Sequence, residues 1–536
     1  MFEVQNQPPP LEPYNLFTSD RVLREAVGRE RANWAEKELT ALGATFGQPE
    51  TVQLGFDANN FPPHLKTLDR YGHRIDEVEF HPAWHALLGI ALRAGLHSSP
   101  WAEPKPGAHV ARAAGTYMLN QVESGVYCPV AMTYGSVPTL RHAPAIAAQW
   151  LPKIFGRDYD KRFIPAKDKT SALLGMGMTE NQGGSDLRTN ATRAAPAGDG
   201  SFRLHGHKWF MSAPMCDAFL VLAQTAKGLS CFLMPRWTPD GERNAIRILR
   251  LKDKLGNRSN ASSEVEFDGA YAQLVGEEGR GIPTIIEMGN YTRLDCAVGS
   301  SALMRQAVTQ AVHHAQYRTA FQKKLIDQPL MTNVLADLAL ECEAATVLTM
   351  RLARAYDESD EASLAIRRVV TPAAKFWICK RTPYVTYEAM EVLGGSGYIE
   401  ESIMPRLYRE APVNSIWEGS GNIMCLDMLR ALSRTPNIGD VLRREFDCGD
   451  ARVKSFAGDL ATQLAAPGRN DEAQARALTR DLVLALQAAL LVKHSPPAVA
   501  DAFCASRLGE ARDGAFGMLP RGADTRAIAE RAATQT

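Results

Sequence analysis

The stretch Glu391–Asp427 reads EVLGGSGYIEESIMPRLYREAPVNSIWEGSGNIMCLD and carries two chemical signals at a short spacing. Three glycines in its first part (Gly394, Gly395 and Gly397) let a backbone approach phosphate groups closely, because glycine has no Cβ. The carboxylate of Glu418 follows between a tryptophan and a glycine, which suits proton transfer beside a bound cofactor. Read alone, Glu418 is more simply an acid at a helix N-terminus, stabilised by the helix dipole, so the decision rests on the remaining sequence.

Length and composition bound the answer. A chain of 536 residues is too long for a single core and is expected to form several domains. Lys plus Arg and Asp plus Glu each total 60, so no global field attracts nucleic acid or an anionic membrane. Nine scattered cysteines, with no CxxC pair, predict reduced thiols and no metal site. Met1–Asn15 lacks the basic start and apolar core of a signal peptide, and no apolar run could span a bilayer, so we expect a cytoplasmic protein.

Residues 1–170 are predicted to form a proline-rich arm followed by a mainly α-helical domain. Ser19-Asp20 can cap the first helix, and further helices are expected over Pro82–Ala94, Ala108–Val122 and Pro144–Leu151. The arm has no periodicity and is expected to pack on something else, with another subunit as one option.

Residues 171–277 are predicted to form a compact antiparallel β-barrel domain. The prediction rests on short β-rich runs, FRLHG, KWFMS, AFLVLAQ, LSCFLMP, AIRIL and SEVEF, which lie between residues 202 and 267. Turn residues separate them, at Gly206-His207 among other places.

Residues 278–436 return to a helical period, and four long segments in sequence favour an antiparallel four-helix bundle. The segments are Ile282–Ala320, Leu330–Tyr356, Ala362–Val392 and Glu418–Ser433. Pro372 and Pro383 are expected to kink or split the third helix, because each removes a backbone donor. Residues 437–536, which follow Pro436, are predicted to form a separate small helical domain.

Three more strings stand in order along the chain: GMGMTENQGGSDLR at 175–188, KWFMS at 208–212 and YRTAF at 317–321. Each has a plain interpretation of its own, as a polar turn, a core strand and a solvated arginine cap. Taken with Gly394–Tyr398 and Trp417–Ser420, however, the five strings resemble the ordered motifs of the acyl-CoA dehydrogenase family of flavoproteins. The resemblance extends to about Arg434.

The match departs from the family motifs at named positions. The motif T-E-x-x-x-G-S-D is met by Thr179, Glu180, Gly184, Ser185 and Asp186. The motif W-I-T/S is met in altered form by Trp209-Phe210-Met211-Ser212, R-x-x-F-G has Gln322 in place of its glycine, and Y-E-G-T has Trp417 in place of its tyrosine. Longer strings, among them HKWFxS, TPAAKF and PRLYRE, resemble the branch of the family that is linked to bacterial alkylation damage responses.

The resemblance implies a mainly α, α+β fold: an N-terminal helical domain, a β-barrel domain, a four-helix bundle and an extra C-terminal helical domain. It also implies FAD, with a neighbouring subunit completing the adenosine end and hence a homotetramer. The residues that this assigns to FAD are Met178, Thr179, Gly184, Ser185, Trp209, Ser212, Arg318, Phe321, Gln328, Gly394, Gly395, Trp417, Gly419, Ser420 and Asn422.

By the same resemblance, Glu418 is the catalytic base that removes the proton α to a thioester carbonyl, while flavin accepts the β-hydride. The family's alternative base position falls at Thr292, which cannot serve. Arg293 and Ser185 would bind an acyl-CoA-like substrate, but Asn290 replaces the acid that usually pairs with the arginine, so tight CoA binding is in doubt. Trp417 would narrow the acyl cavity and favours a specialised or weak dehydrogenase.

Two other functions stay open: a double-stranded DNA-binding flavoprotein that protects or repairs alkylated DNA, and a scaffold with a structural flavin. Ile438–Thr536 holds thirteen basic and thirteen acidic side chains, which gives no net attraction to phosphates. The best local cluster is Arg430, Arg434, Arg443, Arg444, Arg452 and Lys454. A solvated helical face with ordinary ion pairs explains it equally well.

Overall fold

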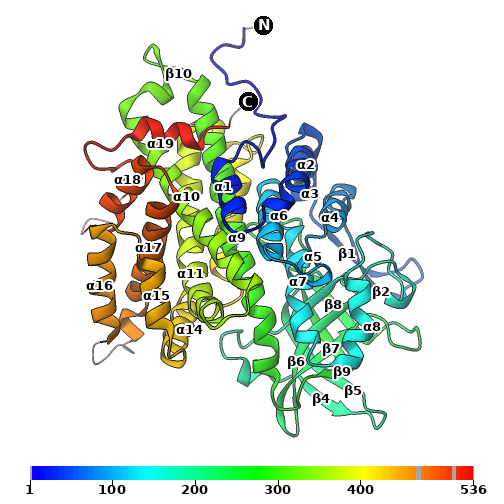
Figure 1. Ribbon diagram of the computed structural model, residues 1–536. Coiled ribbons are helices and arrows are strands. Elements are labelled where there is room, and N and C mark those ends of the chain that lie inside the picture. The colour runs from blue at the N-terminus through cyan, green and yellow to red at the C-terminus, as the bar shows by residue number, and fades with distance from the viewer. Residues whose placement is uncertain (1–2, 466–471, 510–514, 535–536) are drawn as a thin grey trace. The chain divides into compact units, whose positions relative to one another are not determined.

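The computed structural model describes residues 3–465, 472–509 and 515–534 (Figure 1). By its contacts the chain divides into two compact units. The first contains Met1–Pro49, Lys105–Gln121 and Cys296–Thr536, and the second contains Glu50–Pro104 and Val122–Asp295. Within the described ranges, no helix combines the length and apolar character that crossing a membrane requires. All nine cysteines are free thiols.

The second unit is built around a seven-stranded sheet. Its strands are β3 (Leu174–Gly177), β4 (Arg193–Pro196), β5 (Phe202–Ser212), β6 (Ala218–Thr225), β7 (Gly228–Pro235), β8 (Ile246–Leu251) and β9 (Ser262–Val275). The pairings run β6–β4–β5–β9–β7 and return to β6, and β8 adds to β9, so the hydrogen-bonded path closes as a barrel does. The closing contact of β4 with β6 is one residue pair, Arg193 with Gln224.

Two predictions for this sheet are wrong. The sheet is not wholly antiparallel, because β3 and β4 both pair with β6 in parallel. Nor is there a turn at Gly206-His207, because FRLHG and KWFMS belong to the single strand β5. Gly206 has φ +146°, and a Cβ there would lie 2.6 Å from Oγ1 of Thr192, so this glycine permits a close approach inside a strand.

The α-helices that lie mainly in the second unit are α3 (Pro49–Asn60), α4 (Pro82–Arg93), α5 (Ser99–Ala102), α7 (Tyr127–Leu140) and α8 (Pro144–Ile154). The segment predicted to be mainly helical also holds a hairpin that was not expected, β1 (His64–Leu68) with β2 (Arg74–Glu79).

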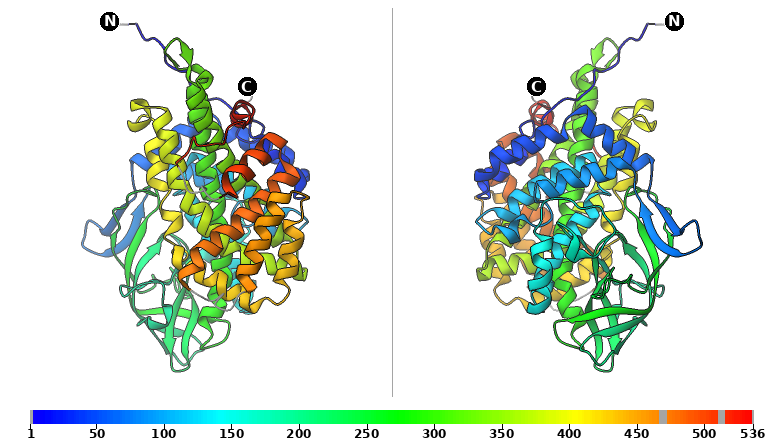
Figure 2. Two further views of the ribbon diagram at one scale, coloured as in Figure 1. Left: turned by 90° about the vertical axis from the view of Figure 1, so that its left-hand side faces the viewer. Right: turned by 90° about the vertical axis from the view of Figure 1, so that its right-hand side faces the viewer.

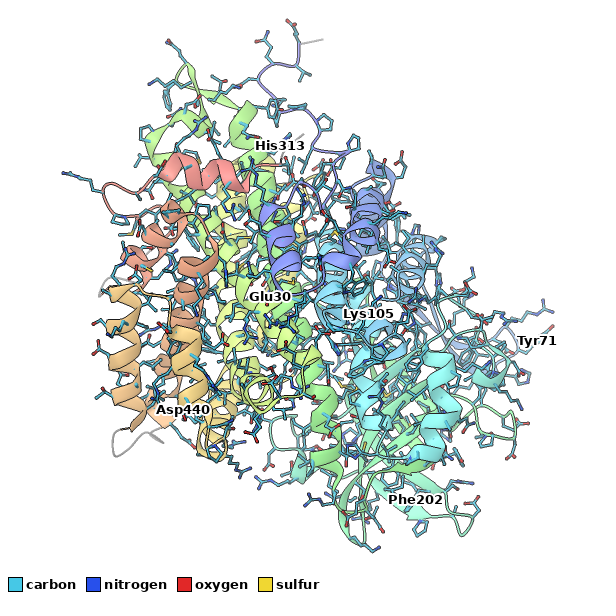
Figure 3. The ribbon with its side chains drawn as sticks, viewed as in Figure 1. Glu30, Tyr71, Lys105, Phe202, His313 and Asp440 are labelled. Carbon is cyan, nitrogen blue, oxygen red and sulfur yellow. The ribbon has the colours of Figure 1, made fainter. Side chains whose placement is uncertain are left out.

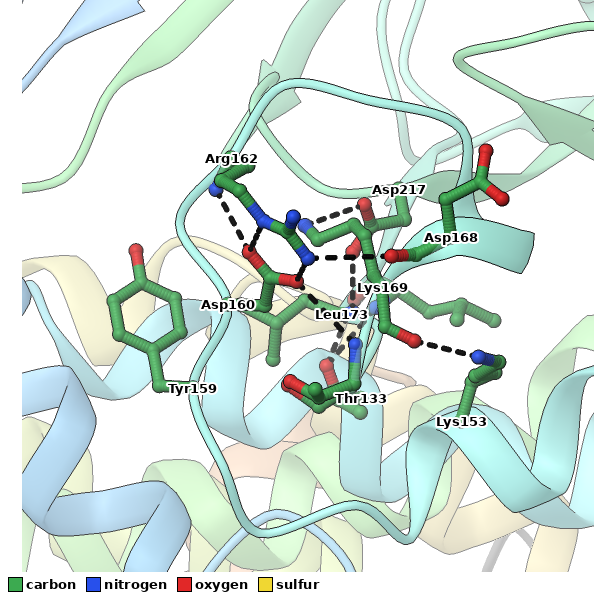
Figure 4. Close-up of polar contacts among 12 residues, drawn as sticks. Thr133, Lys153, Tyr159, Asp160, Arg162, Asp168, Lys169, Leu173 and Asp217 are labelled. Atoms are coloured by element: carbon green, nitrogen blue, oxygen red, sulfur yellow. Dashed lines mark hydrogen bonds and ion pairs between the residues drawn. The ribbon is translucent and has the colours of Figure 1, made fainter. Parts of the chain in front are cut away.

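Polar contacts fix the backbone just before β3 (Figure 4): Lys169 Nζ lies 2.8 Å from Asp217 Oδ1, and Leu173 N–H donates to the other oxygen of the same carboxylate. The backbone that leads to Thr179 is therefore anchored on buried partners.

The first unit holds the helical bundle: α9 (Gly281–Tyr317) from Cys296 onward, α10 (Pro329–Asp357), α11 (Glu361–Val392) and α14 (Gly421–Arg434). Ser300 of α9 bonds Cys379 of α11, and Ser301 bonds Thr349 of α10. The predicted split of the third helix is wrong, because α11 runs unbroken through both prolines. The predicted ends of two helices also shift: α9 stops at Tyr317, and α14 begins three residues after Glu418.

The C-terminal helices are α15 (Ile438–Phe446), α16 (Ala451–Ala465), α17 (Ala475–His494), α18 (Pro497–Arg507) and α19 (Thr525–Ala532), the last of which the sequence did not reveal. Helix α17 packs against α10, α11 and α14 (Figure 2). The N-terminal helices α1 (Arg21–Arg29), α2 (Glu36–Phe46) and α6 (Ala108–Val122) belong to the same unit, with α1 against α10. The four domain boundaries stay a prediction.

Candidate functional site

A buried ion pair joins two of the predicted flavin strings in the second unit. Lys208 Nζ lies 2.7 Å from Oε1 of Glu180, and neither side chain has any exposed surface. Burial alone would raise the pKa of Glu180, but the Lys208 ammonium and the N–H groups of Thr192 and Ala191 hold it at about 2. Glu180 therefore stays charged and fixes the residue before it, Thr179, in space.

The backbone of the same two strings is joined as well. Trp209 N–H donates to the carbonyl of Thr179 at 2.9 Å, and Asn190 Nδ2 donates to the carbonyl of Met178. The structure thus brings together three residues assigned to flavin, Met178, Thr179 and Trp209. The ion pair of Glu180 with Lys208, which joins these strings, could not be predicted from the sequence, because the two residues lie 28 positions apart.

Gly184, in the first string, leaves the space beside the Thr179 side chain open. A Cβ on Gly184 would lie 2.4 Å from Oγ1 of Thr179, so only glycine leaves this hydroxyl accessible from that side. Gly184 and Ser185 are both exposed. The hydroxyl of Thr179 and the backbone after it form a cradle that a side chain would fill.

The end of β5 presents an aromatic ring that the sequence prediction passed over. Phe210 is 51% exposed and Trp209 is half-buried; Lys252 Nζ lies 4.0 Å from the ring centroid of Trp209 and 4.5 Å from that of Phe210. Phe210 lies two residues before Ser212, the spacing of W to T/S in the family motif. The register of β5 slips against β9 between Lys208 and Met211, which marks a bulge at Trp209-Phe210.

Glu418 lies in a tight loop of the first unit and not in the helix. It has φ +58°, a left-handed conformation that side chains rarely adopt, and Gly419 follows with φ +97°. Ser420 is the N-cap residue of α14. Trp417 is fixed by its indole N–H, which donates to Asn414 Oδ1 at 3.0 Å. Helix-dipole stabilisation in a regular first turn, the simpler interpretation of Glu418, does not describe this backbone.

The loop rests on a lysine that the sequence prediction missed. Lys375 of α11 is completely buried, and its Nζ donates to the carbonyls of Trp417 and Gly419. The string TPAAKF around Lys375 carries part of the family resemblance but assigns this lysine no role, and only the fold places its ammonium group against the loop of Glu418.

The string around Arg318 forms a small hairpin at the end of α9. Strands β10 (Thr319–Ala320) and β11 (Lys323–Lys324) are joined by Phe321 and Gln322, which both have positive φ. Phe321 is 93% exposed, and Gln328 Nε2 donates to the carbonyl of Ala320. The predicted FAD residues Arg318, Phe321 and Gln328 therefore share one hairpin.

The N-terminal arm contacts this hairpin within the same chain. Asn6 exchanges two hydrogen bonds with Thr319, and Arg318 Nη1 donates to the carbonyl of Asn6 at 2.6 Å. His313, labelled in Figure 3, lies 2.8 Å from the carbonyl of Pro9. The arm thus has an intrachain partner at the end of α9.

The glycine turn opens α12 (Gly395–Tyr398) in the first unit. Gly394 has φ +60°, and a Cβ on Gly394 or Gly395 would meet no atom within 4 Å, so this backbone is open. Gly397 has a different task, because a Cβ there would lie 2.4 Å from the carbonyl of Met390. Of the remaining predicted residues in the first unit, Asn422 accepts a hydrogen bond from Arg476 Nη1.

Of the two predicted substrate residues, Ser185 lies in the exposed loop of the first string, and Arg293 lies in the part of α9 that belongs to the second unit. Arg293 is buried, and its Nη1 lies 3.4 Å from Oδ1 of Asn290, so the neutral partner that the sequence showed does contact the arginine. The hydroxyl of Thr292 bonds backbone carbonyls of its own helix.

Known proteins cover the whole of this architecture. Residues 6–161 match the Adaptive response protein AidB N-terminal domain, 175–270 the acyl-CoA dehydrogenase middle domain, and 279–433 the acyl-CoA dehydrogenase C-terminal domain. The chain is 50% identical over 507 residues to AidB of Escherichia coli (strain K12), which is 94% of this chain and 93% of that protein. The chain belongs to the acyl-CoA dehydrogenase family.

Two solved structures agree with this assignment to the acyl-CoA dehydrogenases. Caenorhabditis elegans ACDH-11 in complex with C11-CoA superposes with a TM-score of 0.85 at 26% identity, over 99% of this chain and 92% of that one. The apo-form of Bd2924 gives a TM-score of 0.82 at 29% identity, over 92% and 100% of the two chains. The AidB-type fold is therefore shared along nearly the full length.

FAD is the cofactor of the acyl-CoA dehydrogenase family, and the residues present fit it. Its isoalloxazine ring needs hydrogen-bond donors and a flat apolar surface, which Thr179, Ser212 and the exposed Phe210 offer in the second unit. Its phosphates need open backbone and a cation, which Gly394, Gly395 and Arg318 offer in the first unit.

Proposed function

We propose that this AidB-type protein is an FAD-dependent oxidoreductase acting on acyl-CoA-like thioesters, with Glu418 as the catalytic base. One observation carries the proposal: Glu418 occupies a left-handed position in a loop whose two flanking carbonyls are held by a buried cation. Backbone strain of this kind costs about 1–3 kcal/mol and persists where the surrounding structure enforces it, typically at functional sites.

The loop has two chemical tasks in this reaction. The Glu418 carboxylate accepts the proton α to the thioester carbonyl. The backbone N–H of the same residue donates to the carbonyl oxygen and stabilises the negative charge that develops there. Bound FAD supplies the acceptor for the β-hydride. The positive φ of Glu418 is what allows the side chain and the N–H of one residue to serve one substrate.

The cofactor-binding residues follow from the geometry of each unit. Thr179 and Ser212 would donate to the flavin edge, with Phe210 and Trp209 beside its ring. Arg318 and the open turn at Gly394-Gly395 would hold the phosphate and adenosine end, which in the family comes from a neighbouring subunit. Asn422, Ser420 and Gly419 would complete the flavin environment around Glu418.

A homotetramer is part of the proposal. Large apolar side chains stand exposed on the first unit around the Arg318 hairpin, α11 and α12, namely Phe321, Leu330, Tyr384, Tyr387, Tyr398 and Ile399. Burying these rings in a second copy would remove a large apolar area from water. Light scattering coupled to gel filtration should give four times the mass of the chain, and a monomer that retains FAD would contradict the shared site.

The substrate class is proposed from Arg293 and from the relative that is solved with C11-CoA. Arg293 would bind the substrate, and its contact with neutral Asn290 provides a hydrogen bond without an opposite charge. Binding weaker than that of an arginine paired with an acid is expected, and the indole of Trp417 restricts the acyl chain. The protein is thus a specialised dehydrogenase of modest affinity for thioesters.

The deciding experiment is an anaerobic titration of the purified yellow protein with acyl-CoA thioesters of increasing chain length. Bleaching of the oxidised flavin band by at least one thioester is expected, together with its loss in Glu418→Gln. Glu418→Gln must retain FAD, since the amide keeps the size of the side chain. A wild-type flavin that no thioester bleaches would overturn the proposed reaction and leave a scaffold with structural flavin.

Duplex DNA binding linked to alkylation damage is a second proposed function, supported by exposed Arg430, Arg434 and Arg444. Two members of the basic cluster are already neutralised: Arg443 by Asp440, labelled in Figure 3, and Arg452 by Asp450 and Asp501. With few unpaired charges, log Kd should change with log salt by a slope of only about 3. The double variant Arg430→Ala with Arg434→Ala should bind duplex DNA more weakly. A Kd that does not change with salt concentration would exclude contacts between these arginines and phosphates.

A further inference from the structure

We infer that Lys375 is the positioning residue for Glu418: its ammonium group holds and polarises the peptide that donates to the thioester carbonyl. This inference rests on the proposed function and adds a residue to it. Lys375 Nζ donates to Trp417 O at 2.7 Å and to Gly419 O. One carbonyl belongs to the residue before Glu418 and the other to the residue after it, so one cation fixes the loop on both sides of the reactive residue.

The first of these hydrogen bonds acts on the oxyanion donor directly. The carbonyl of Trp417 and the N–H of Glu418 belong to the same planar peptide unit, so fixing the oxygen also fixes the direction of the N–H. A cation at the oxygen end draws electron density away from the nitrogen end, and hydrogen-bond chains strengthen one another in this way. The Glu418 N–H therefore becomes a better donor to the developing enolate oxygen.

The second hydrogen bond acts on the carboxylate. Glu418 and Gly419 both have positive φ, a conformation that a non-glycine residue such as Glu418 adopts only at an energetic cost. By binding the carbonyl of Gly419, the residue after Glu418, Lys375 opposes relaxation of this turn. Two hydrogen bonds hold the other side of the loop: the Trp417 indole N–H donates to Asn414 Oδ1, and Asn414 Nδ2 donates to Ser300 Oγ.

The burial of Lys375 needs such an explanation. A completely buried ammonium group is among the most costly groups to place in a protein interior, so it persists only where its hydrogen bonds are strong. Both of these hydrogen bonds go to carbonyls of the loop, so the charge of Lys375 is directed at the loop. A methionine of similar shape would fill the same space without that cost.

The test uses the full-length FAD-loaded protein and the variant Lys375→Met, with Lys493→Met as the matched control, because the exposed Lys493 of α17 donates to the carbonyl of Glu445 away from this loop. Hydrogen–deuterium exchange of the peptide spanning 413–424 should quicken about tenfold or more in K375M, because the loop loses both fixed carbonyls, and should stay unchanged in K493M. The FAD absorbance band should be retained in both variants. Equal exchange in K375M and wild type would overturn the inference.

A kinetic readout separates positioning from general damage. With an 11-carbon acyl-CoA, the limiting rate of flavin bleaching in K375M should fall by roughly 10²-fold or more, as for the loss of one oxyanion donor. The thioester concentration at half-saturation should change by less than about threefold, since binding lies elsewhere. An unchanged limiting rate, or a loss confined to affinity, would refute the assigned role.

A second variant protects the test against misfolding. Lys375→Gln keeps one neutral donor, so its loop exchange and its bleaching rate should fall between those of wild type and K375M. Wild-type behaviour in K375Q would show that no cation is needed and would overturn the inference. If no thioester bleaches even the wild-type flavin, the proposed reaction fails, while the exchange measurement still decides whether Lys375 holds the loop.

Discussion

The ammonium group of Lys208 and the carboxylate of Glu180 form a fully buried ion pair, with 2.7 Å between Nζ and Oε1. Each residue precedes or follows an assigned flavin contact, Thr179 on one string and Trp209 on the other. Burial lowers the pKa of Lys208 to about 8, while Glu180 keeps a pKa of about 2, so both groups are charged at neutral pH. The place that we propose for the flavin edge therefore depends on an ion pair that is closed to water.

Lys208→Met should release FAD and destabilise the protein. Removing one partner of a buried pair leaves the other charge uncompensated and costs about 3–5 kcal/mol. Urea unfolding and retained flavin absorbance measure the two effects. The double change Lys208→Met with Glu180→Gln should recover part of the stability, because no buried charge remains. Lys227→Met, which removes an exposed pair with Glu278, is the control and should change stability by less than about 1 kcal/mol. A K208M protein as stable as wild type would contradict the pairing.

Asp357 gives a pH dependence of defined sign. Burial raises the pKa of Asp357 to about 7, even though the N–H groups of His109 and Val110 donate to it. Because the folded protein binds the proton of Asp357 more tightly than the unfolded chain does, this proton stabilises the folded state. The stabilisation is complete below about pH 4 and is lost as the pH rises through 7. The stability of Asp357→Asn minus that of wild type should therefore grow, on the order of 3 kcal/mol, between pH 4 and pH 8.

Two controls isolate this effect. Burial lowers the pKa of His109 to about 3, so the stability that neutral His109 contributes is lost as the pH falls. Wild type and Asp357→Asn both contain His109, so this contribution cancels when their stabilities are subtracted. Asp360 caps α11 and has a lowered pKa, so Asp360→Asn should not show the growth. Thermal unfolding across the pH range measures all three proteins, and a difference that is flat for Asp357→Asn would refute the shift.

A buried cluster attaches the C-terminal helices to the bundle. Arg507 of α18 bonds Asp337, and its Nη2 lies 3.4 Å from Glu341, both of which are buried on α10. Arg507→Met should cost about 3–5 kcal/mol and expose α17 and α18 to limited proteolysis, because two carboxylates lose a partner. Arg526→Met, at a half-exposed pair with Asp327, should cost less than about 1 kcal/mol. Equal protection of both variants would show that packing alone attaches these helices.

Local patterns predicted much of the secondary structure, because its causes are local. The spacing of apolar residues predicted the helix Ala108–Val122, and the structure has the same bounds. The turn expected at Gly206 failed because its cause lies 14 residues away, at Thr192, which leaves no room for a Cβ. From the sequence alone, a glycine at this position is equally consistent with a turn and with a strand that packs closely against another residue.

Some residues of the candidate site could likewise be predicted from local sequence motifs, and others only from the fold. Family motifs pointed to Glu418 and Thr179, and these assignments stay predictions until tested chemically. Lys375 escaped notice because a lysine in a long helix is ordinarily a solvated residue. Only the packing of α11 under the loop reveals that its ammonium group meets two carbonyls. Long-range polar partners of this kind have no signature in one sequence.

The hairpin turn at Phe321-Gln322 offers a test of a family departure. A two-residue hairpin loop of type I′ has positive φ at both central positions, as Phe321 and Gln322 do here, and Gln322 has φ +64° where the family motif has glycine. Gln322→Gly should stabilise the hairpin against local opening by about 1 kcal/mol, whereas Gln322→Ala keeps the strain and should not. Exchange of the Leu325 amide, which donates to the carbonyl of Arg318, reports the opening. It should slow about fivefold in the glycine variant only, and slowing in both variants would mean that the glutamine side chain, not the backbone, limits the turn.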